Sequence, residues 1–259
     1  MTPRGSFRAV SLDLWFTILY YPLENENRWK EDRLRALGEM VRKKSGERFP
    51  PSVLESAVNA VRERLAAQGR DTVVVDPQAL VTAYAESLDA TLSVPPDEAG
   101  RRLSSVGLSE HPPLVNPEVA AVVEVLEARR IPVIAITNTN RREDSWQDFL
   151  GSRANLHLRH IVTSCEVGSA KPDPEIFFEA SRRLGVPPAE ILHVGDRWEL
   201  DVDGALRSGC GAALYRGLWS FYPLDFYPRT DLPETEYPDV LRIDRLDELL
   251  RGDLLRGPD

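Results

Sequence analysis

The chain has 259 residues, of which 42% are hydrophobic and 28% are charged, and its formal net charge at pH 7 is −9. This length suits one large α/β domain, or a core domain that carries an insertion. The negative charge disfavours a broad surface for phosphate backbones, so we expect no nucleic-acid partner. A pocket can still be locally positive, so a small anionic substrate remains compatible with this charge.

The same composition predicts an intracellular protein. The chain contains Cys165 and Cys210 without a Cys-x-x-Cys pattern, and its four histidines lack zinc spacing, so we expect two reduced, buried thiols. No apolar run approaches the ~20 residues that a membrane span needs, and residues 1–8 lack the apolar core of a signal peptide. We therefore expect a cytoplasmic protein without a membrane partner, either a monomer or a homodimer.

Taken in chain order, the predicted elements begin with a strand and a long helical stretch. The apolar run Ala9–Leu12 predicts a buried strand that Asp13 closes, and the next convincing strand begins only at Pro132. Between them the hydrophobic spacing and the Pro and Gly signals predict four amphipathic helices and no strand, at 24–45, 51–68, 76–90 and 96–106. We therefore predict a helical bundle inserted into an α/β domain, with residues 21–112 as the insertion and residues 1–20 and 113–259 as the core.

From Asn116 onwards helices and strands alternate. The predicted strands are 132–137, 160–163, 191–194, 212–215 and 240–243, and the predicted helices are 116–130, 142–150, 173–185, one that ends at Ser208, and 245–250. Residues 217–239, rich in proline and aromatics, are expected to form an ordered loop on the core. This alternation predicts right-handed βαβ units and hence a doubly wound parallel sheet, Rossmann-like in its organisation.

Polar residues follow four of these strands or the loops beyond them. They are Asp13 with Thr17, the pair Thr137-Asn138, Lys171, and Gly195-Asp196 with Asp201. Each segment alone is an ordinary turn, cap or solvated lysine. Because the carboxyl ends of parallel strands meet at one edge of a sheet, the four together predict a single site.

A carboxylate, hydroxyls and an amine gathered in this way suit nucleophilic chemistry. Asp13 would attack phosphorus or carbon to form a covalent intermediate, and the Thr17 hydroxyl would orient that carboxylate. The Thr137 hydroxyl and the Asn138 backbone N–H would hold substrate oxygens, while Lys171 would balance the clustered negative charge.

Three carboxylates in one place also predict a cation. Asp13, Asp196 and Asp201 would repel one another without one, and Mg²⁺ prefers such oxygen ligands while leaving room for water and a substrate phosphate. The expected cofactor is therefore Mg²⁺, and the expected partner is a small phosphorylated molecule.

These motifs resemble those of the haloacid dehalogenase-like hydrolase superfamily. The resemblance runs from Asp13 to the C-terminus and includes 164–177 (SCEVGSAKPDPEIF), 193–196 (HVGD) and Asp201. The inserted helices are similar to the family's cap, which closes over the site and selects substrates. The resemblance implies a hydrolase in which the backbone carbonyl of Trp15 joins the three carboxylates as a metal ligand.

Trp15 is the departure from the family pattern, because the first motif usually reads Asp-x-Asp-x-Thr and here reads DLWFT. In the family's phosphatases that second Asp is the general acid/base, which an indole cannot replace, and losing such catalysis typically costs ~10²–10⁴ in rate. The sequence favours a phosphatase-type hydrolase whose substrate has a good leaving group or whose acid comes from the cap.

Two alternatives stay open. A metal-independent 2-haloacid dehalogenase needs no leaving-group proton, and family dehalogenases carry an aromatic residue at this position, but the acidic pair Asp196 and Asp201 has no use without a cation. A catalytically impaired binding or interaction protein would leave the whole set of polar residues unexplained. As donors from the cap, Glu24 and Glu26 are candidates, whereas we expect Arg28 and Trp29 to lie on the cap's own faces.

Overall fold

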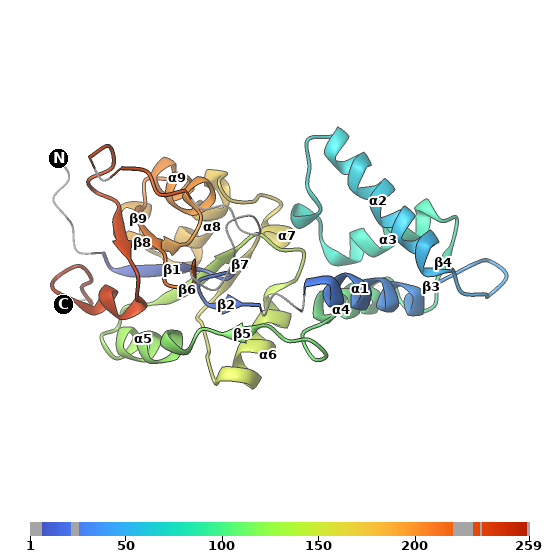
Figure 1. Ribbon diagram of the computed structural model, residues 1–259, viewed down its shortest axis with the longest axis horizontal. Helices are drawn as coiled ribbons and strands as arrows, with labels where there is room; N and C mark the ends of the chain where they lie inside the picture. The colour runs from blue at the N-terminus through green and yellow to red at the C-terminus, as the bar shows by residue number, and fades with distance from the viewer. Residues whose placement is uncertain (1–6, 22–25, 220–229, 234, 258–259) are drawn as a thin grey trace.

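A six-stranded parallel sheet forms the centre of the larger part of the molecule (Figure 1). The structure is a computed structural model that describes residues 7–21, 26–219, 230–233 and 235–257. The strand order is β10-β9-β8-β1-β6-β7. The strands are β1 (Ala9–Asp13), β6 (Val133–Thr137), β7 (Ile161–Thr163), β8 (Ile191–Gly195), β9 (Gly211–Tyr215) and β10 (Leu241–Ile243). Because β1 lies between β6 and β8, its carboxyl end is at the centre of the sheet edge.

Helices cover both faces of this sheet, as Figure 1 shows. On one face α5 (Pro117–Ala128), α6 (Glu143–Ala154) and the 3-10 helix η6 (Leu246–Leu250) pack against side chains such as Val10 and Leu12. On the other face α8 (Pro174–Leu184), the π-helical turn η4 (Trp198–Val202) and α9 (Asp203–Arg207) pack against Ala9 and Ile134. Alternate residues of β1 thus serve two cores, and the predicted doubly wound α/β fold is confirmed.

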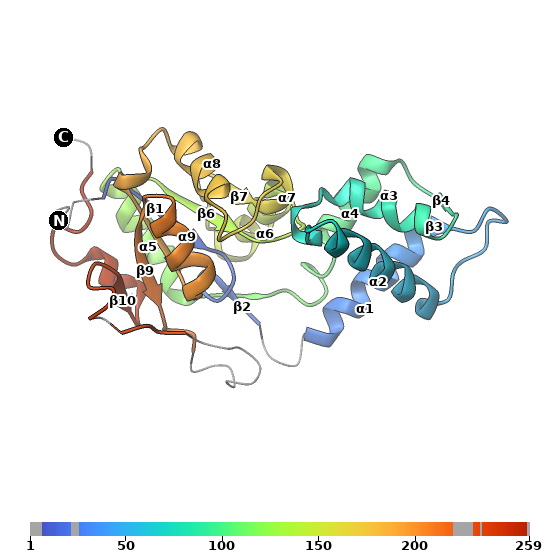
Figure 2. The same cartoon turned by 90° about the horizontal axis from the view of Figure 1, so that it is seen from above.

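The insertion is a bundle of four helices, α1 (Glu26–Met40), α2 (Pro51–Ala67), α3 (Pro77–Ser87) and α4 (Pro96–Ser105). It lies beside the sheet domain in both views (Figures 1 and 2) and has an apolar core of its own, which includes Leu37, Leu54, Leu80 and Leu103. As predicted, Asp76 caps α3 by accepting a hydrogen bond from Gln78 N at 2.8 Å. The bundle therefore buries its apolar stripes internally rather than on the sheet.

Short antiparallel ribbons were missed by the sequence analysis. The helix expected over 24–45 ends at Met40, and β3 (Val41–Arg42) pairs with β4 (Thr91–Leu92). A second ribbon joins β2 (Leu19–Tyr20) to β5 (Leu114–Val115), where the chain leaves and re-enters the sheet domain. The expectation of no strand between Asp13 and Pro132 is therefore wrong, because strands of two residues are too short to show a period.

Other boundaries differ in smaller ways. The helix α6 continues to Ala154 and ends at Asn155 in the left-handed conformation, and the segment 246–250 is a 3-10 helix rather than an α-helix. Three short helical turns were not expected: η2 (Thr72–Val74), α7 (Ser164–Val167) and η3 (Pro188–Glu190). The aromatic loop expected at 217–239 lies partly outside the described residues, which exclude 220–229 and 234. No helix within the described ranges is long and apolar enough to cross a bilayer.

Candidate active site

The carboxyl ends of three adjacent strands bring the predicted residues together. Asp13 ends β1, Thr137 ends β6 and Asp196 follows β8. The register places Asp13 opposite Ile136 of β6 and Leu12 opposite Val194 of β8, so these residues share one edge of the sheet. Asp13, Thr137 and Asp196 are all buried. The predicted gathering at the sheet edge is therefore present, in the position where α/β folds bind ligands.

Lys171 is the ionic centre of this site. Its Nζ lies 2.5 Å from Asp13 Oδ1 and 2.6 Å from Asp201 Oδ1. The side chain of Asn138 fixes the backbone of the same lysine: Nδ2 donates to the Lys171 carbonyl at 2.9 Å, and the Lys171 N–H donates to Oδ1 at 2.8 Å. Sequence reasoning assigned Asn138 only a backbone role, so the positioning role of its side chain is an addition from the structure.

Asp201 reaches this lysine by passing very close to the backbone of β8. A Cβ atom added to Gly195 would lie 2.2 Å from Asp201 Cγ, so only glycine fits before Asp196. The carboxylate also accepts a hydrogen bond from Arg197 N at 2.9 Å. Because several protein donors hold Asp201, it positions Lys171 in addition to contributing negative charge.

His193 is a further member of the site that sequence reasoning missed. It is buried in β8, with Nδ1 at 2.9 Å from Ser11 Oγ and Nε2 at 3.2 Å from Asp201 Oδ1. Burial lowers the pKa of His193, and Lys171 lowers it further, so the ring is neutral. Since a carboxylate only accepts, Nε2–H donates to Asp201 and Nδ1 accepts from the Ser11 hydroxyl. The signal in the sequence was a polar residue in each of two otherwise apolar strands.

The charges of the site favour an added cation. Burial raises the pKa of Asp13 to about 7, against the attraction of Lys171. Burial alone would also raise the pKa of Asp201, but Lys171 and His193 together hold it below its usual range. Ligand oxygens of Asp13, Asp196 and Asp201 all lie within 4.8 Å of one another and are buried. This group of three buried carboxylates fits Mg²⁺, which prefers oxygen ligands.

Two hydroxyls of the predicted site are buried and have no hydrogen-bond partner among the described residues: Thr17 Oγ1 and Thr137 Oγ1. The expected hydrogen bond from Thr17 to Asp13 is therefore not seen. A buried hydroxyl without a partner is costly. Thr137, at the end of β6 beside Asp13, thus has a free donor at the place predicted for substrate oxygens.

Trp15 lies in a cluster of aromatic rings where the bundle meets the sheet domain. Its ring stacks on Tyr21 at 4.8 Å between centroids, and it meets Trp29 at 5.6 Å and Trp146 at 5.4 Å edge to face. Trp29 belongs to α1, but its ring packs against Trp15 and the core of the sheet domain. The expectation that this ring lies on the bundle's own face is therefore wrong. Arg28 is exposed as expected. The indole of Trp15 thus packs the bundle against the sheet domain.

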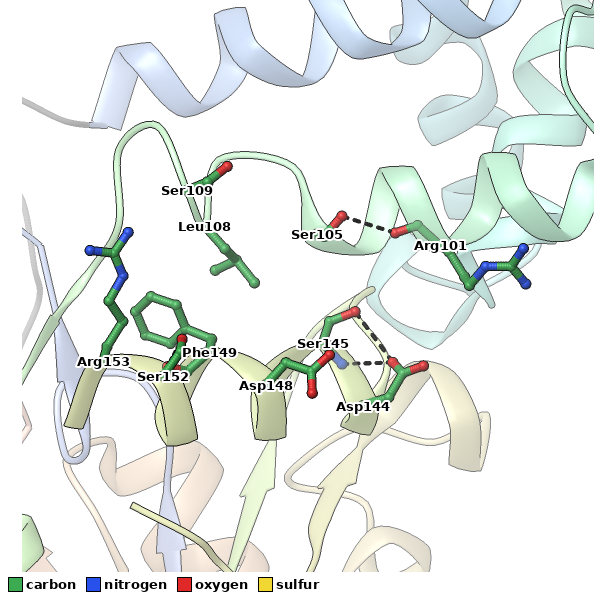
Figure 3. Close-up of a pocket in the computed structure, with 10 residues that line it drawn as sticks. All are labelled: Arg101, Ser105, Leu108, Ser109, Asp144, Ser145, Asp148, Phe149, Ser152 and Arg153. Atoms are coloured by element: carbon green, nitrogen blue, oxygen red, sulfur yellow. Dashed lines mark hydrogen bonds between the residues drawn. The ribbon is translucent and has the colours of Figure 1, made fainter. Parts of the chain in front are cut away.

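Two sequence candidates fall outside the described part of the chain, and an open cavity lies away from this cluster. Glu24 and the side chain of Glu26 fall outside the described residues. A cavity of about 410 Å³ lies between α4, the segment that follows it, and α6 (Figure 3). Leu108 and Phe149 line it together with exposed polar side chains, and its lining includes no predicted site residue. This cavity is therefore separate from the candidate active site.

Comparison with known proteins gives a family and a fold. Residues 35–209 match the model of the family described as "Hydrolase: haloacid dehalogenase-like hydrolase". The chain is 44% identical over 64 residues (25% of this chain, 28% of the relative) to a glyceraldehyde 3-phosphate phosphatase of Methanopyrus kandleri. It is 32% identical over 130 residues (50% and 52%) to a 5-amino-6-(5-phospho-D-ribitylamino)uracil phosphatase of Escherichia coli. The chain spans about a quarter to a half of the length of these relatives.

Solved structures resemble nearly the whole chain at low sequence identity. A 2-haloacid dehalogenase from Pseudomonas syringae pv. Tomato has a TM-score of 0.58 and 22% identity, covering 94% of this chain and 96% of its own. A phosphatase from Thermococcus onnurineus has a TM-score of 0.52 and 21% identity, covering 95% and 98%. At these identities the likeness shows a shared fold.

Proposed function

The chain belongs to the haloacid dehalogenase-like hydrolases, and we propose that it is a magnesium-dependent phosphatase acting on a small phosphorylated molecule with Asp13 as its nucleophile. The observation that carries this proposal is the buried ionic cluster in which Lys171 joins Asp13 to Asp201, with an Asp196 oxygen within 4.8 Å of an oxygen of each. Metal-independent chemistry gives Asp196 no role. The phosphatases among the relatives support the same reaction class.

In the proposed reaction an oxygen of Asp13 attacks phosphorus, and the bond from phosphorus to the leaving oxygen breaks. The products of this step are an aspartyl-phosphate and the leaving group as an oxyanion. Water then attacks phosphorus, the bond from phosphorus to the Asp13 oxygen breaks, and the carboxylate is returned with dihydrogen phosphate, which carries both protons of the water. Lys171 attracts the Asp13 carboxylate and so opposes the rise in its pKa that burial causes. The Thr137 hydroxyl and the Asn138 backbone N–H donate to phosphoryl oxygens. Mg²⁺, held by Asp13, Asp196, Asp201 and the Trp15 carbonyl, would neutralise charge on the transferring group.

Trp15 restricts the substrate, because an indole neither protonates a leaving oxygen nor activates water at neutral pH. The reaction is therefore proposed to be efficient where the leaving group departs without a proton, as an aryl or acyl oxygen does. Simple alkyl phosphates are proposed to be poor substrates of the natural protein.

The test measures two activities of the full chain with and without MgCl₂: phosphate release from p-nitrophenyl phosphate and chloride release from 2-chloropropionate. Magnesium-dependent phosphate release that Asp13→Asn abolishes supports the proposal. Asp97→Asn is the matched control, since Asp97 is an exposed carboxylate paired with Arg101 on α4. Metal-independent chloride release would instead assign the dehalogenase reaction, which the aromatic residue at position 15 favours. Neither activity, with ligand affinity unchanged in Asp13→Asn, would point to a binding protein.

A further inference from the structure

Arg141 is a buried cation next to the aromatic cluster. It lies in the loop between β6 and α6, four residues after Thr137, and is 2% exposed. Its guanidinium lies over the ring of Trp29, 4.5 Å from the centroid, and 5.6 Å from the centroid of Trp146. Both rings also contact Trp15. Arg141 and Trp15, the third residue of the motif that begins with Asp13, thus contact the same two rings.

The guanidinium of Arg141 has unused hydrogen-bonding capacity. Nη1 donates to the Ser104 carbonyl at 2.5 Å, whereas Nη2 is buried and has no hydrogen-bond partner among the described residues. Burial lowers the pKa of Arg141 to about 9, so the group is still charged at neutral pH. A buried charge without a counter-ion is costly unless a ligand supplies one.

A second guanidinium adds to the positive charge at this place. Arg33 of α1 donates from Nη1 to Asn140 Oδ1 at 3.0 Å, one residue before Arg141. Burial is the main cause that lowers the pKa of Arg141, and the nearby charge of Arg33 lowers it further. Within the described part of the chain neither arginine has a carboxylate partner, although the protein has 41 acidic residues against 32 basic ones.

A purely structural role for Arg141 fits less well, because its neighbour already fastens the bundle to the sheet domain. Arg142 donates from Nε and Nη2 to the two oxygens of Asp76, at 3.0 and 2.9 Å. That pair is an ordinary bidentate ion pair with its charge balanced. Of two consecutive arginines, one has a carboxylate partner and the other has none in the described ranges, and this contrast points to an anion that is supplied from outside the chain.

We propose that Arg141, supported by Arg33, binds a second anionic group of the substrate and so determines specificity. The substrate class is a phosphate monoester that carries a carboxylate or a second phosphate a few bonds from the scissile one. This inference rests on the proposed function, since it presumes that the other end of the substrate is the phosphoryl group at Asp13.

The test uses binding rather than turnover, so that it does not depend on catalysis. Isothermal titration in the presence of MgCl₂ compares propylphosphonate with 3-phosphonopropionate, which adds a carboxylate, and with propane-1,3-diphosphonate, which adds a second phosphonate. We expect wild type to bind at least one of the charged-tail probes about 10- to 100-fold more tightly than propylphosphonate. Tight binding of 3-phosphonopropionate would identify the second anionic group of the substrate as a carboxylate, and tight binding of propane-1,3-diphosphonate would identify it as a phosphate.

The preference should disappear in Arg141→Met and weaken in Arg33→Met. Arg242→Met is the matched control, since Arg242 also lies over a tryptophan ring, Trp198, but is paired with Asp231. If Arg141→Met fails to fold, Arg141→Lys keeps the charge and loses the planar fork, and it should lose most of the preference. Equal affinity of wild type for all three probes would overturn the inference, as would an equal loss for all three in a folded Arg141 variant. Absence of phosphatase activity would count only against the proposed function.

Discussion

Replacing Trp15 by aspartate tests whether the missing proton-transfer group limits phosphatase activity. The substitution removes the three ring contacts of Trp15, with Tyr21, Trp29 and Trp146. Aromatic pairs of this kind contribute ~0.5–1.5 kcal/mol each, and truncating a half-buried tryptophan costs about 2–4 kcal/mol in total. For a chain of this size the melting temperature should fall by roughly 5–15 °C. The variant should therefore still be folded at 20 °C.

The matched control is Trp15→Asn, which loses the same ring contacts as Trp15→Asp and introduces a side chain of the same size that has no carboxyl group. The ratio of kcat/KM between the two variants isolates the carboxyl group. For an alkyl phosphate this ratio should reach ~10²–10⁴, because the leaving alkoxide needs a proton. For p-nitrophenyl phosphate it should be smaller, since p-nitrophenolate leaves unprotonated.

The assay is phosphate release under MgCl₂, with circular dichroism melts of both variants. If the two variants differ by less than about threefold on the alkyl phosphate while both are folded, position 15 does not limit proton transfer. In that case the acid would have to come from elsewhere, and the restriction to good leaving groups would be withdrawn.

Four other substitutions separate positioning from packing. Lys171→Met should abolish turnover and lower stability by about 3–5 kcal/mol, because it leaves two buried carboxylates uncompensated, and calorimetry should show partial recovery with Mg²⁺. Asn138→Ala removes two hydrogen bonds to the backbone of Lys171 and should lower kcat, and it should lower stability by about 1–3 kcal/mol. Thr137→Val should raise KM and leave stability unchanged, because the Thr137 hydroxyl has no hydrogen-bond partner among the described residues. Equal melting curves for these two variants would contradict this distinction. Gly195→Ala should give little folded protein, since its Cβ would meet Asp201, and a normal melting temperature would show that the backbone can yield there.

The fold could be predicted from local patterns because β1, β6, β8 and β9 are short apolar runs and the helices carry capping signals. Asp76-Pro77, Asn116-Pro117 and Asp173-Pro174 each begin a helix, with the polar side chain accepting the capping hydrogen bond. The two ribbons could not be predicted. Their strands have two residues each and owe their pairing to the approach of distant segments rather than to a periodic sequence.

For the site, chain order and strand ends were enough to gather Asp13, Thr137 and Lys171, because parallel strands deliver their carboxyl ends to one edge. The partners of each group required coordinates. Asn138 uses its side chain on Lys171, and His193 links Ser11 to Asp201 through hydrogen bonds between neighbouring strands. Such contacts depend on register and on side-chain direction, which no spacing rule specifies.

By itself the sequence determined the fold class, the inserted helices and the residues from which a catalytic site could be built. Only the tertiary structure decided the surroundings of Trp15 and Arg141. Trp15 marks the absence of an acid in the sequence, but in the fold it packs the bundle against the sheet domain through rings from separate elements. Arg141 resembles any polar loop residue until burial against those rings leaves its charge without a carboxylate partner among the described residues. Burial and charge balance arise from contacts between segments distant in sequence, so they exist only once the chain has folded.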